Sequence, residues 1–164
     1  MSMITIRSAP LDAAAASDEV HELVSVTVAD QIFGIPVLQV QDVLGPQRIT
    51  RIPLAPPEVA GSLNLRGRIV TAIDLRTRLR LPPLPEARKS MSVVVDHEGE
   101  LYSILVDGVG EVLKLNGNSA ERNPPTLDAT WRDVSAGVYR LEKTILIVLN
   151  VERVLDFSAR ADAI

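Results

Sequence analysis

The chain has 164 residues, of which 46% are hydrophobic, and this length suits one domain or two small subdomains around an apolar core. The formal net charge of −4 argues against a general nucleic-acid-binding protein, which needs a basic surface to displace counterions from phosphates. The sequence contains no cysteine, which excludes disulfides and thiolate metal sites. Aromatic residues make up only 3%, so valine, leucine and isoleucine must build the core, and β-branched richness favours strands.

The sequence shows no signal for entry into a membrane. No apolar run reaches the ~18 residues of a membrane span. The N-terminus also lacks the basic region and the long apolar segment of a signal peptide. We therefore expect a cytoplasmic protein without direct membrane insertion. Residues 1–20 have no clear periodicity, and we expect a flexible N-terminal tail there, with a short helix as an alternative.

The first half of the chain contains short apolar segments separated by turn residues, which is typical of a β-rich fold. Residues 23–28 and 31–37 predict the two strands of a hairpin. The segment 39–44 is apolar at every third position, Val40 and Val43, so it fits either a strand or a turn of helix. The remaining expected elements are a strand at 49–52, one or two helical turns at 56–61, and a second hairpin with strands at 63–65 and 69–74.

A proline-rich connection at 81–86 joins this half to a second series of strands. The expected strands of the second half are 91–96, 100–106, 111–115, 136–141 and 143–150. Residues 116–128, with two adjacent prolines, form its long loop. Many short strands with Gly and Pro at the turns argue for closed barrels rather than a parallel sheet.

The two halves resemble each other in the order of their elements. Residues 26–44 match residues 95–113 at an offset of 69 positions. Residues 61–79 match residues 137–155 at an offset of 76. Because internal repeats fix architecture, the sequence predicts two similar all-β halves in tandem.

The residues needed for catalysis are scarce. His21 lies at the edge of the tail and His97 at a hairpin turn, where we expect both to be solvated. The carboxylates of Asp74, Asp96 and Asp107 follow or end strands, where capping of turns is the common use. No metal-ligand spacing and no Gly-rich loop opening a helix is present. We therefore expect neither enzymatic activity nor a metal or cofactor.

Three arginines, Arg76, Arg78 and Arg80, would lie on one face if their segment were extended. The simpler interpretation is a solvated strand or helix end. Binding of nucleic acid is disfavoured because no aromatic stacking platform accompanies the arginines. A protein partner is the better functional alternative.

Arg66 precedes Gly67 in the turn between two apolar strands. It can bond loop carbonyls or pair with a carboxylate, or it can present its five fixed donors beside an apolar groove. The sequence leaves these alternatives open.

Four valines occupy matching places in the two halves: Val40, Val43, Val109 and Val112. Their spacing of three favours core positions. If the segments lie at a seam between subdomains, some of the valines would instead line an apolar groove, which is the usual acceptor of an amphipathic helix.

A combination of motifs between residues 22 and 156 carries a family resemblance. The motifs are Phe33-Gly34-Ile35-Pro36-Val37, Thr50-Arg51-Ile52-Pro53, Asn64-Leu65-Arg66-Gly67, Ile73-Asp74-Leu75-Arg76, Val106-Asp107-Gly108-Val109 and Ile145-Leu146-Ile147-Val148-Leu149-Asn150. Together they resemble CheW, the family of bacterial chemotaxis coupling proteins. Ala72 departs from the pattern, because the family commonly has proline there.

The resemblance implies an all-β fold of two tandem, intertwined five-stranded SH3-like barrels, with short helices in the connections. The CheW-like domain would span residues 21–158, with subdomains at approximately 21–81 and 90–158 that can exchange strands. Residues 159–164 would form a C-terminal tail.

The resemblance also implies a non-enzymatic adaptor that couples the cytoplasmic tip of methyl-accepting chemoreceptors to the regulatory domain of a CheA-type histidine kinase. The protein would then be recruited to chemoreceptor arrays. Matching positions give the receptor-groove residues Val40, Arg66, Val109 and Val112. Weaker matches give the kinase-contact residues Ile49, Ile52 and Leu54 on the first barrel and Leu127 on the second. The alternative is a scaffolding or peptide-binding module that serves a sensory kinase cluster outside chemotaxis.

Overall fold

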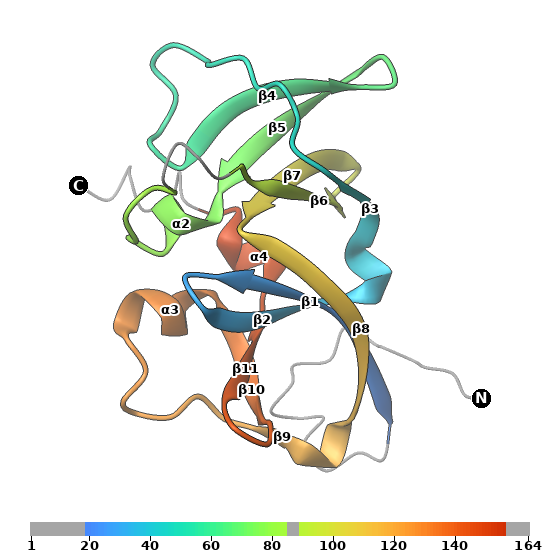
Figure 1. Cartoon of the computed structure of the whole chain (residues 1–164), viewed down its shortest axis with the longest axis vertical. Coiled ribbons are helices and arrows are strands. Elements are labelled where there is room, and N and C mark those ends of the chain that lie inside the picture. The colour runs from blue at the N-terminus through green and yellow to red at the C-terminus, as the bar shows by residue number, and fades with distance from the viewer. Residues whose placement is uncertain (1–18, 85–88, 157–164) are drawn as a thin grey trace.

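The structure, a computed structural model, describes residues 19–84 and 89–156. The described chain forms two β-sheets joined by short helices (Figure 1). The elements are β1 (Val20–Val28), β2 (Gln31–Pro36), η1 (Val37–Gln39), β3 (Val40–Leu44), β4 (Val59–Leu65), β5 (Arg68–Asp74), α2 (Leu75–Arg78), β6 (Met91–His97), β7 (Glu100–Val106), β8 (Gly108–Asn116), η2 (Gly117–Ser119), β9 (Ala120–Glu121), α3 (Ala129–Val134), β10 (Ser135–Arg140), β11 (Ile145–Leu149) and α4 (Val151–Val154). The predicted C-terminal tail and most of the predicted N-terminal tail lie outside the described residues.

Each sheet curls into a small barrel, and the two barrels stack along the long axis of the molecule (Figure 1). The lower barrel has the strand order β8-β1-β2-β11-β10-β9, and the upper barrel has the order β3-β6-β7-β5-β4. Most neighbours are antiparallel, but β2 pairs with β11 and β5 with β7 in parallel. These two parallel pairs join the early and late strands of each barrel.

The repeat detected in the sequence is also visible in this order. At the observed offsets, β1 and β2 match β6 and β7, β3 matches β8, and β5 with α2 matches β11 with α4. The lower barrel therefore takes β1 and β2 from the first half and β8, β10 and β11 from the second. The upper barrel shows the reverse combination. The predicted all-β fold of two intertwined barrels is confirmed.

Three hairpins turn tightly through two residues in the left-handed region. These pairs are Ala29 and Asp30, Arg66 and Gly67, and Glu98 and Gly99, all with positive φ. Two-residue turns of this kind match the right-handed twist of the flanking strands. In the last two, the Asn64 and Asp96 side chains accept from the amides of Gly67 and Gly99. Local side-chain bonds thus fix the strand register at both turns.

Among the described residues the core has three parts, which are built mostly from aliphatic side chains. One cluster lies within the lower barrel around Leu23 and Tyr139, and a second lies within the upper barrel around Leu63 and Val70. The third and largest cluster includes residues of β1, β2, β6, β7, β10 and β11 together with α2, α3 and α4. Because it draws on both sheets, this shared core joins the barrels through burial of apolar surface.

Two sequence predictions about local structure were wrong. Residues 49–52 do not form a strand, since Thr50 makes a single bridge to Ser62. The helical turns predicted at 56–61 are absent, because β4 begins at Val59 and pairs with Ile73 of β5. The ambiguous segment 39–44 is resolved as the end of η1 followed by the strand β3. The predicted loop 116–128 contains η2 and the short strand β9.

The arginine run lies at a helix, which was one of its expected forms, but the expected solvation is wrong for Arg76 and Arg78, whose side chains are largely buried. The side chain of Asp74 accepts from the backbone amide of Arg76 and caps α2. Arg78 is only 3% exposed and donates to the carbonyls of Arg153 and Val154 at 2.9 and 3.1 Å. It therefore binds the C-terminal end of α4, where orphan carbonyls attract a cation.

His21 is likewise not solvated as predicted. Its Nδ1 atom lies 2.7 Å from the Tyr139 hydroxyl oxygen, and the residue is 9% exposed. The reason is that β1 begins at Val20, so His21 is already held in the sheet opposite Leu115 of β8. His97 remains partly exposed at the turn between β6 and β7.

Candidate partner-binding surfaces

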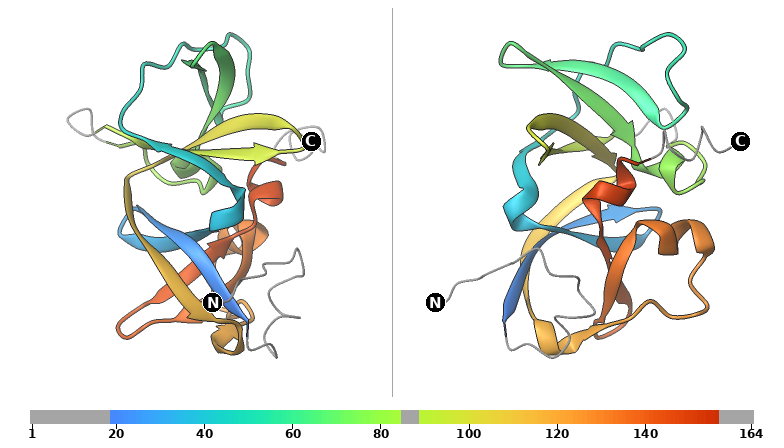
Figure 2. Two further views of the ribbon diagram at one scale, coloured as in Figure 1. Left: turned by 90° about the vertical axis from the view of Figure 1, so that its right-hand side faces the viewer. Right: turned by 180° about the vertical axis from the view of Figure 1, so that it is seen from behind.

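One candidate surface is formed by β3 and β8. They are edge strands of the upper and the lower barrel, respectively, and both lie on the right-hand side of the molecule in Figure 1, as the turned view confirms (Figure 2). Each carries a register shift at a matching place, opposite Val94 and Val95 for β3 and opposite Val24 and Val26 for β8. Such bulges are common at sheet edges and re-aim the side chains that follow.

The four valines of this surface divide into two pairs. Val40 and Val109 are half-buried and pack against the shared core. Val43 and Val112 are exposed, and Val112 keeps 49% of its surface accessible. The core positions expected from the spacing are therefore confirmed only in part, for Val40 and Val109. Val43 and Val112 present their methyl groups to solvent. Val112 pairs with Val24 of β1, so its backbone is nevertheless fixed.

Arg66 stands at the tip of the β4–β5 hairpin with a φ of 53°. Its Nη2 atom donates to the Asp42 carboxylate of β3 at 3.1 Å, and its side chain is 77% exposed. Of the alternatives that the sequence left open for Arg66, the structure shows the pairing with a carboxylate. Both partners belong to the upper barrel. The exposed guanidinium keeps donors available beside β3. Ile69, on the adjacent strand β5, is also an exposed apolar residue.

Sequence reasoning missed Leu38. It lies in η1, where the chain crosses from β2 of the lower barrel to β3 of the upper one, and it is an exposed apolar side chain. The repeat could have drawn attention to this position, because an offset of 69 aligns Leu38 with Asp107, the residue at the second crossing between the barrels. An apolar residue at one crossing and an acidic one at the other distinguishes the two halves.

A second candidate surface lies on the connection 45–58 between β3 and β4, which runs over the upper barrel away from the lower one (Figure 1). Ile52 is exposed, and Leu54 is fully exposed with a φ of 66°. Ile49 is half-buried and packs against the core of the upper barrel. Leu127 precedes α3 and packs against the shared core, so the structure does not group it with the other three.

Backbone contacts hold this connection against β4. The amide of Thr50 donates to the Ser62 carbonyl and the Ser62 amide donates to the Thr50 carbonyl, both at 2.8 Å. Gly61 makes the approach feasible: a Cβ atom there would lie 2.2 Å from the Thr50 carbonyl oxygen. The Gly61 φ of 150° is also one that residues with a side chain rarely adopt.

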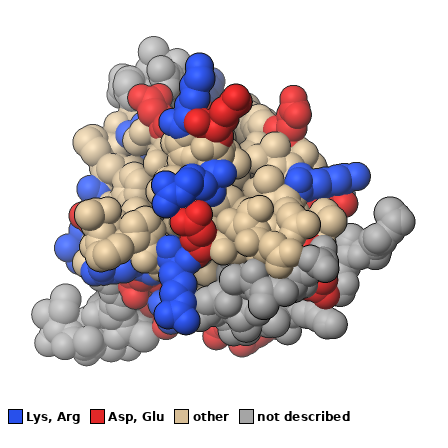
Figure 3. Space-filling model, turned by 90° about the horizontal axis from the view of Figure 1, so that it is seen from below, with Lys and Arg blue, Asp and Glu red and all other residues tan. Residues whose placement is uncertain are grey.

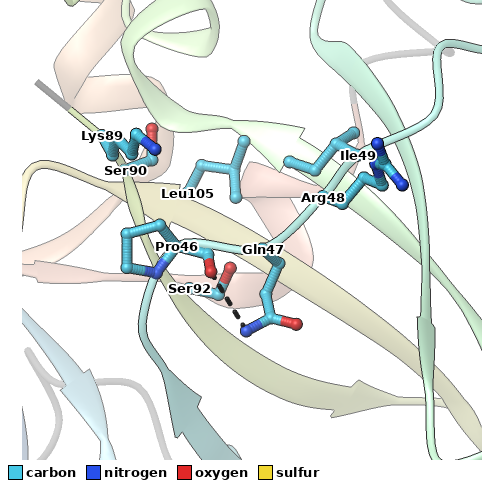
Figure 4. A pocket seen from close by; sticks show the side chains of 8 residues that line it. All are labelled: Pro46, Gln47, Arg48, Ile49, Lys89, Ser90, Ser92 and Leu105. Atoms are coloured by element: carbon cyan, nitrogen blue, oxygen red, sulfur yellow. Dashed lines mark hydrogen bonds between the residues drawn. The ribbon is translucent and has the colours of Figure 1, made fainter. Parts of the chain in front are cut away.

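A pocket of about 470 Å³ lies beside this connection, between residues 46–49 and the strands β6 and β7 (Figure 4). The buried Ser92 hydroxyl group lines it without a hydrogen-bond partner. The charged ends of Arg48 and Lys89 lie on opposite sides of the view and do not converge on Ser92 (Figure 4). Bound anions in proteins are held by converging donors, and the pocket does not provide that arrangement.

Several charged side chains of the described residues form ion pairs, among them Arg66 with Asp42, Arg76 with Asp107 and Arg140 with Glu121. Burial raises the pKa of Tyr139 to about 12 and lowers the pKa of its partner His21. Hydrogen bonds that the guanidinium groups of Arg76 and Arg140 donate to the carboxylates of Asp107 and Glu121 raise the pKa values of both arginines. Within residues 19–84 and 89–156, no three acidic or histidine side chains are grouped so that they could hold a metal ion.

No described helix is both long and apolar enough to span a bilayer. On the face seen from below, basic and acidic side chains are interspersed (Figure 3).

The fold and its exposed edge strands define an all-β binding module made of two strand-exchanged barrels. The chain belongs to the family of the CheW-like domain, whose family model matches residues 22–159. Among characterised relatives, the chemotaxis protein CheW of Klebsiella aerogenes is 29% identical, with 82% of this chain and 81% of the relative covered. The chemotaxis protein CheW of Helicobacter pylori is 24% identical, with 85% and 84% covered.

A solved structure supports the fold. The crystal structure of the scaffolding protein TtCheW from Thermoanaerobacter tengcongensis superposes with a TM-score of 0.70 at 28% identity. The match covers 79% of this chain and 88% of that protein. The protein PilI of Pseudomonas aeruginosa is a further relative, 26% identical over 71% of this chain and 66% of its own length.

Proposed function

We propose that the protein is a non-enzymatic chemotaxis adaptor that couples the cytoplasmic tip of methyl-accepting chemoreceptors to the regulatory domain of a CheA-type histidine kinase. Membership of the CheW-like family and similarity to chemotaxis proteins across most of the chain support this role. We place the protein in the cytoplasm, at chemoreceptor arrays. Residues 21–158 act as one unit, because each barrel needs strands from both halves.

The observation that carries the proposal is that one small protein offers two separate surfaces. The receptor face consists of Val40, Val109 and Val112 on β3 and β8, with Arg66 beside them. The kinase face lies on the connection over the upper barrel and includes Ile52 and Leu54. An adaptor needs two surfaces that can be occupied at once, and their placement on different elements permits this.

The chemistry of the receptor face suits a helix. Val112 is exposed and Val40 and Val109 are half-buried on the edge strands, and together they provide an apolar strip. An amphipathic helix buries its apolar face against such a strip. The exposed guanidinium of Arg66 can bond a carboxylate or a carbonyl of that helix in a planar, two-pronged geometry. A receptor tip with apolar residues at helical spacing and a flanking acidic residue would satisfy both groups.

The kinase face has a different character. Leu54 is held in the left-handed region, where a leucine costs about 1 kcal/mol or more. Full exposure of this leucine returns no burial energy in the free protein. If the Leu54 side chain entered a pocket on a partner, the burial of its apolar surface would stabilise the complex. We therefore assign the kinase contact to Ile52 and Leu54. Ile49 is half-buried against the core of the upper barrel, and Leu127 is partly buried against the shared core. Both stay weaker candidates for the kinase contact.

The proposal is tested by reconstitution. The purified protein is mixed with a CheA-type kinase, with receptor-containing membranes, or with both, and kinase autophosphorylation is measured. We expect strong stimulation only when all three are present. The protein alone should neither hydrolyse ATP nor transfer phosphate. Stimulation without receptor, or binding of neither partner by the wild-type protein, would exclude the role.

A further inference from the structure

Asp107 is the single residue at which the chain crosses from the upper to the lower barrel. It lies between β7, which belongs to the upper sheet, and β8, which belongs to the lower one. At the other crossing, three residues of η1 join β2 to β3. A one-residue connection leaves little freedom, so the groups that hold Asp107 determine where β8 begins.

Asp107 is held by contacts from both barrels. Both of its carboxylate oxygens accept from Arg76 of α2, at 2.9 Å from Nε and 2.7 Å from Nη2. One of these oxygens also accepts from the amide of Ala29 in the β1–β2 turn at 2.8 Å. The Asp107 amide donates to the carbonyl of Thr27 at 2.9 Å. The side chains of Arg76 and Asp107 are 14% and 12% exposed, so water screens the pair weakly.

Arg76 is itself fixed on the upper barrel. It is the second residue of the helix α2, which follows β5, and its Nη1 atom donates to the Pro82 carbonyl at 2.6 Å. All three guanidinium nitrogens are therefore engaged. A lysine cannot reproduce this set, because an ammonium lacks the planar fork that bonds two carboxylate oxygens at once.

The strand that follows carries the proposed receptor face. Val109 is the second residue of β8, and Val112 lies beyond the bulge that is braced by a bond from the Ser25 hydroxyl to the Glu111 carbonyl. Because β8 is an edge strand, only β1 pairs with it within the sheet. The contacts of Asp107 thus supply the second constraint on the start of β8.

We propose that Arg76 is a positioning residue for receptor binding: through its two-pronged contact with Asp107 it sets where β8 leaves the upper barrel, and so the placement of Val109 relative to Val40 on β3. Arg76 does not touch the receptor. The inference rests on the proposed receptor face. It gives a role to Arg76, one of the three arginines whose function the sequence left open.

The test uses the full chain with the variants Arg76→Ala and Arg76→Lys. Binding of a soluble receptor hairpin and of a kinase regulatory domain is titrated against each. We expect receptor affinity to fall about tenfold or more for Arg76→Ala and less for Arg76→Lys, with kinase affinity changed by less than about twofold. Hydrogen exchange of the free protein should be faster at the start of β8 in both variants.

Arg140→Ala is the matched control. Arg140 also makes a two-pronged contact with a carboxylate, that of Glu121, at 3.1 and 3.2 Å, but it lies on β10, which does not pair with β8. Its removal should leave receptor affinity and exchange in β8 unchanged. Equal loss of receptor and kinase affinity in Arg76→Ala and Arg76→Lys, or unchanged receptor affinity in Arg76→Ala, would overturn the inference.

Val112→Asp separates this failure from failure of the proposed function. If Val112→Asp abolishes receptor binding while Arg76→Ala does not weaken it, the receptor face stands and the positioning role of Arg76 is wrong. If neither variant alters receptor affinity, the receptor face itself is wrong, and the role of Arg76 is rejected with it.

Discussion

Arg66 reaches from the β4–β5 turn to Asp42 of β3, with its Nη2 atom 3.1 Å from the carboxylate oxygen. The pair ties the tip of a hairpin to the edge strand of the same barrel. Because the arginine side chain is 77% exposed, the ion pair contributes little to folding, about 0.2–1 kcal/mol for surface pairs in general. The arginine is therefore free to serve a partner without loss of the fold.

We expect Arg66→Ala to weaken receptor binding by about one to two decades, because hydrogen bonds to a charged group are worth ~1.5–3 kcal/mol. Arg66→Lys should restore the affinity only in part. Titration calorimetry with a receptor hairpin measures both. Kinase-domain affinity of the same variants is the control and should stay unchanged. Unaltered receptor affinity in Arg66→Ala would show that Arg66 is not a recognition residue.

Val112→Asp should impair receptor binding far more than folding. Val112 is half exposed on an edge strand, so an aspartate there stays hydrated and costs about 1 kcal/mol or less in strand propensity. Beneath a receptor helix the same charge would be desolvated and unpaired, at a cost of a few kcal/mol. Urea unfolding and receptor titration separate the two effects. Val112→Thr keeps the branched shape and is the control. Loss of several kcal/mol of stability would assign Val112 to the core.

Leu54→Asp should have the opposite selectivity. Aspartate tolerates a positive φ better than leucine does, so the free energy of unfolding should stay the same or rise slightly. Kinase-domain affinity should fall, because a charge replaces the exposed apolar side chain. Receptor affinity should not change. Leu54→Asn, without the charge, distinguishes repulsion from loss of apolar contact. Unchanged kinase affinity in both variants would remove Leu54 from that surface.

The repeat allowed much of the fold to be predicted. The matched segments predicted two similar all-β halves, whereas the exchange of strands between the barrels was expected only from the family resemblance. Arg66-Gly67 marked its hairpin correctly because two-residue turns have local sequence signals. Arg78 could not be placed in this way. Its partners, the carbonyls of α4, lie about 75 residues away and carry no side-chain signature. Backbone acceptors are the same for every sequence, so burial of a cation against them is not visible in residue patterns.

The predictions of secondary structure in the connection 45–58 were wrong for a related reason. Residues 49–52 have the composition of a strand, but only Thr50 finds a bridge, to Ser62 of β4. Pro56 and Pro57 suggested a helix start, yet Val59 and Gly61 pair with β5 instead. The first segment has strand propensity but lacks a continuous pairing partner, and in the second segment pairing with β5 overrode the local helix signal. The candidate residues on this connection therefore depended on the family resemblance rather than on the expected elements.

Gly61 gives a direct test of how this connection is held. Gly61→Ala places a Cβ atom 2.2 Å from the Thr50 carbonyl oxygen and requires an unfavourable φ. We expect the connection to shift, with a loss of about 1–3 kcal/mol in the free energy of unfolding and weaker kinase-domain binding. Receptor affinity should be spared. Gly45→Ala, where a Cβ meets no atom within 4 Å, is the control. Normal kinase affinity in Gly61→Ala would separate the kinase surface from this connection.

The buried pair of His21 and Tyr139 predicts a dependence of stability on pH. Burial lowers the pKa of His21 below its ordinary value of 6.5, and the nearby Glu19 opposes this only in part. The folded protein therefore binds fewer protons than the unfolded chain between the lowered pKa and 6.5. The stabilisation from the neutral imidazole is fully present above pH 6.5 and is lost as the pH falls through that window.

We expect wild-type protein to lose more stability between pH 7.5 and pH 5 than His21→Gln, whose side chain does not titrate. Urea unfolding at several pH values measures the difference between the two curves. Tyr139→Phe removes the hydroxyl partner and should lower the free energy of unfolding at pH 7.5 by about 1 kcal/mol. The phenol itself does not titrate in this range, because its pKa is about 12. Parallel curves for wild type and His21→Gln would show that the imidazole does not couple folding to pH.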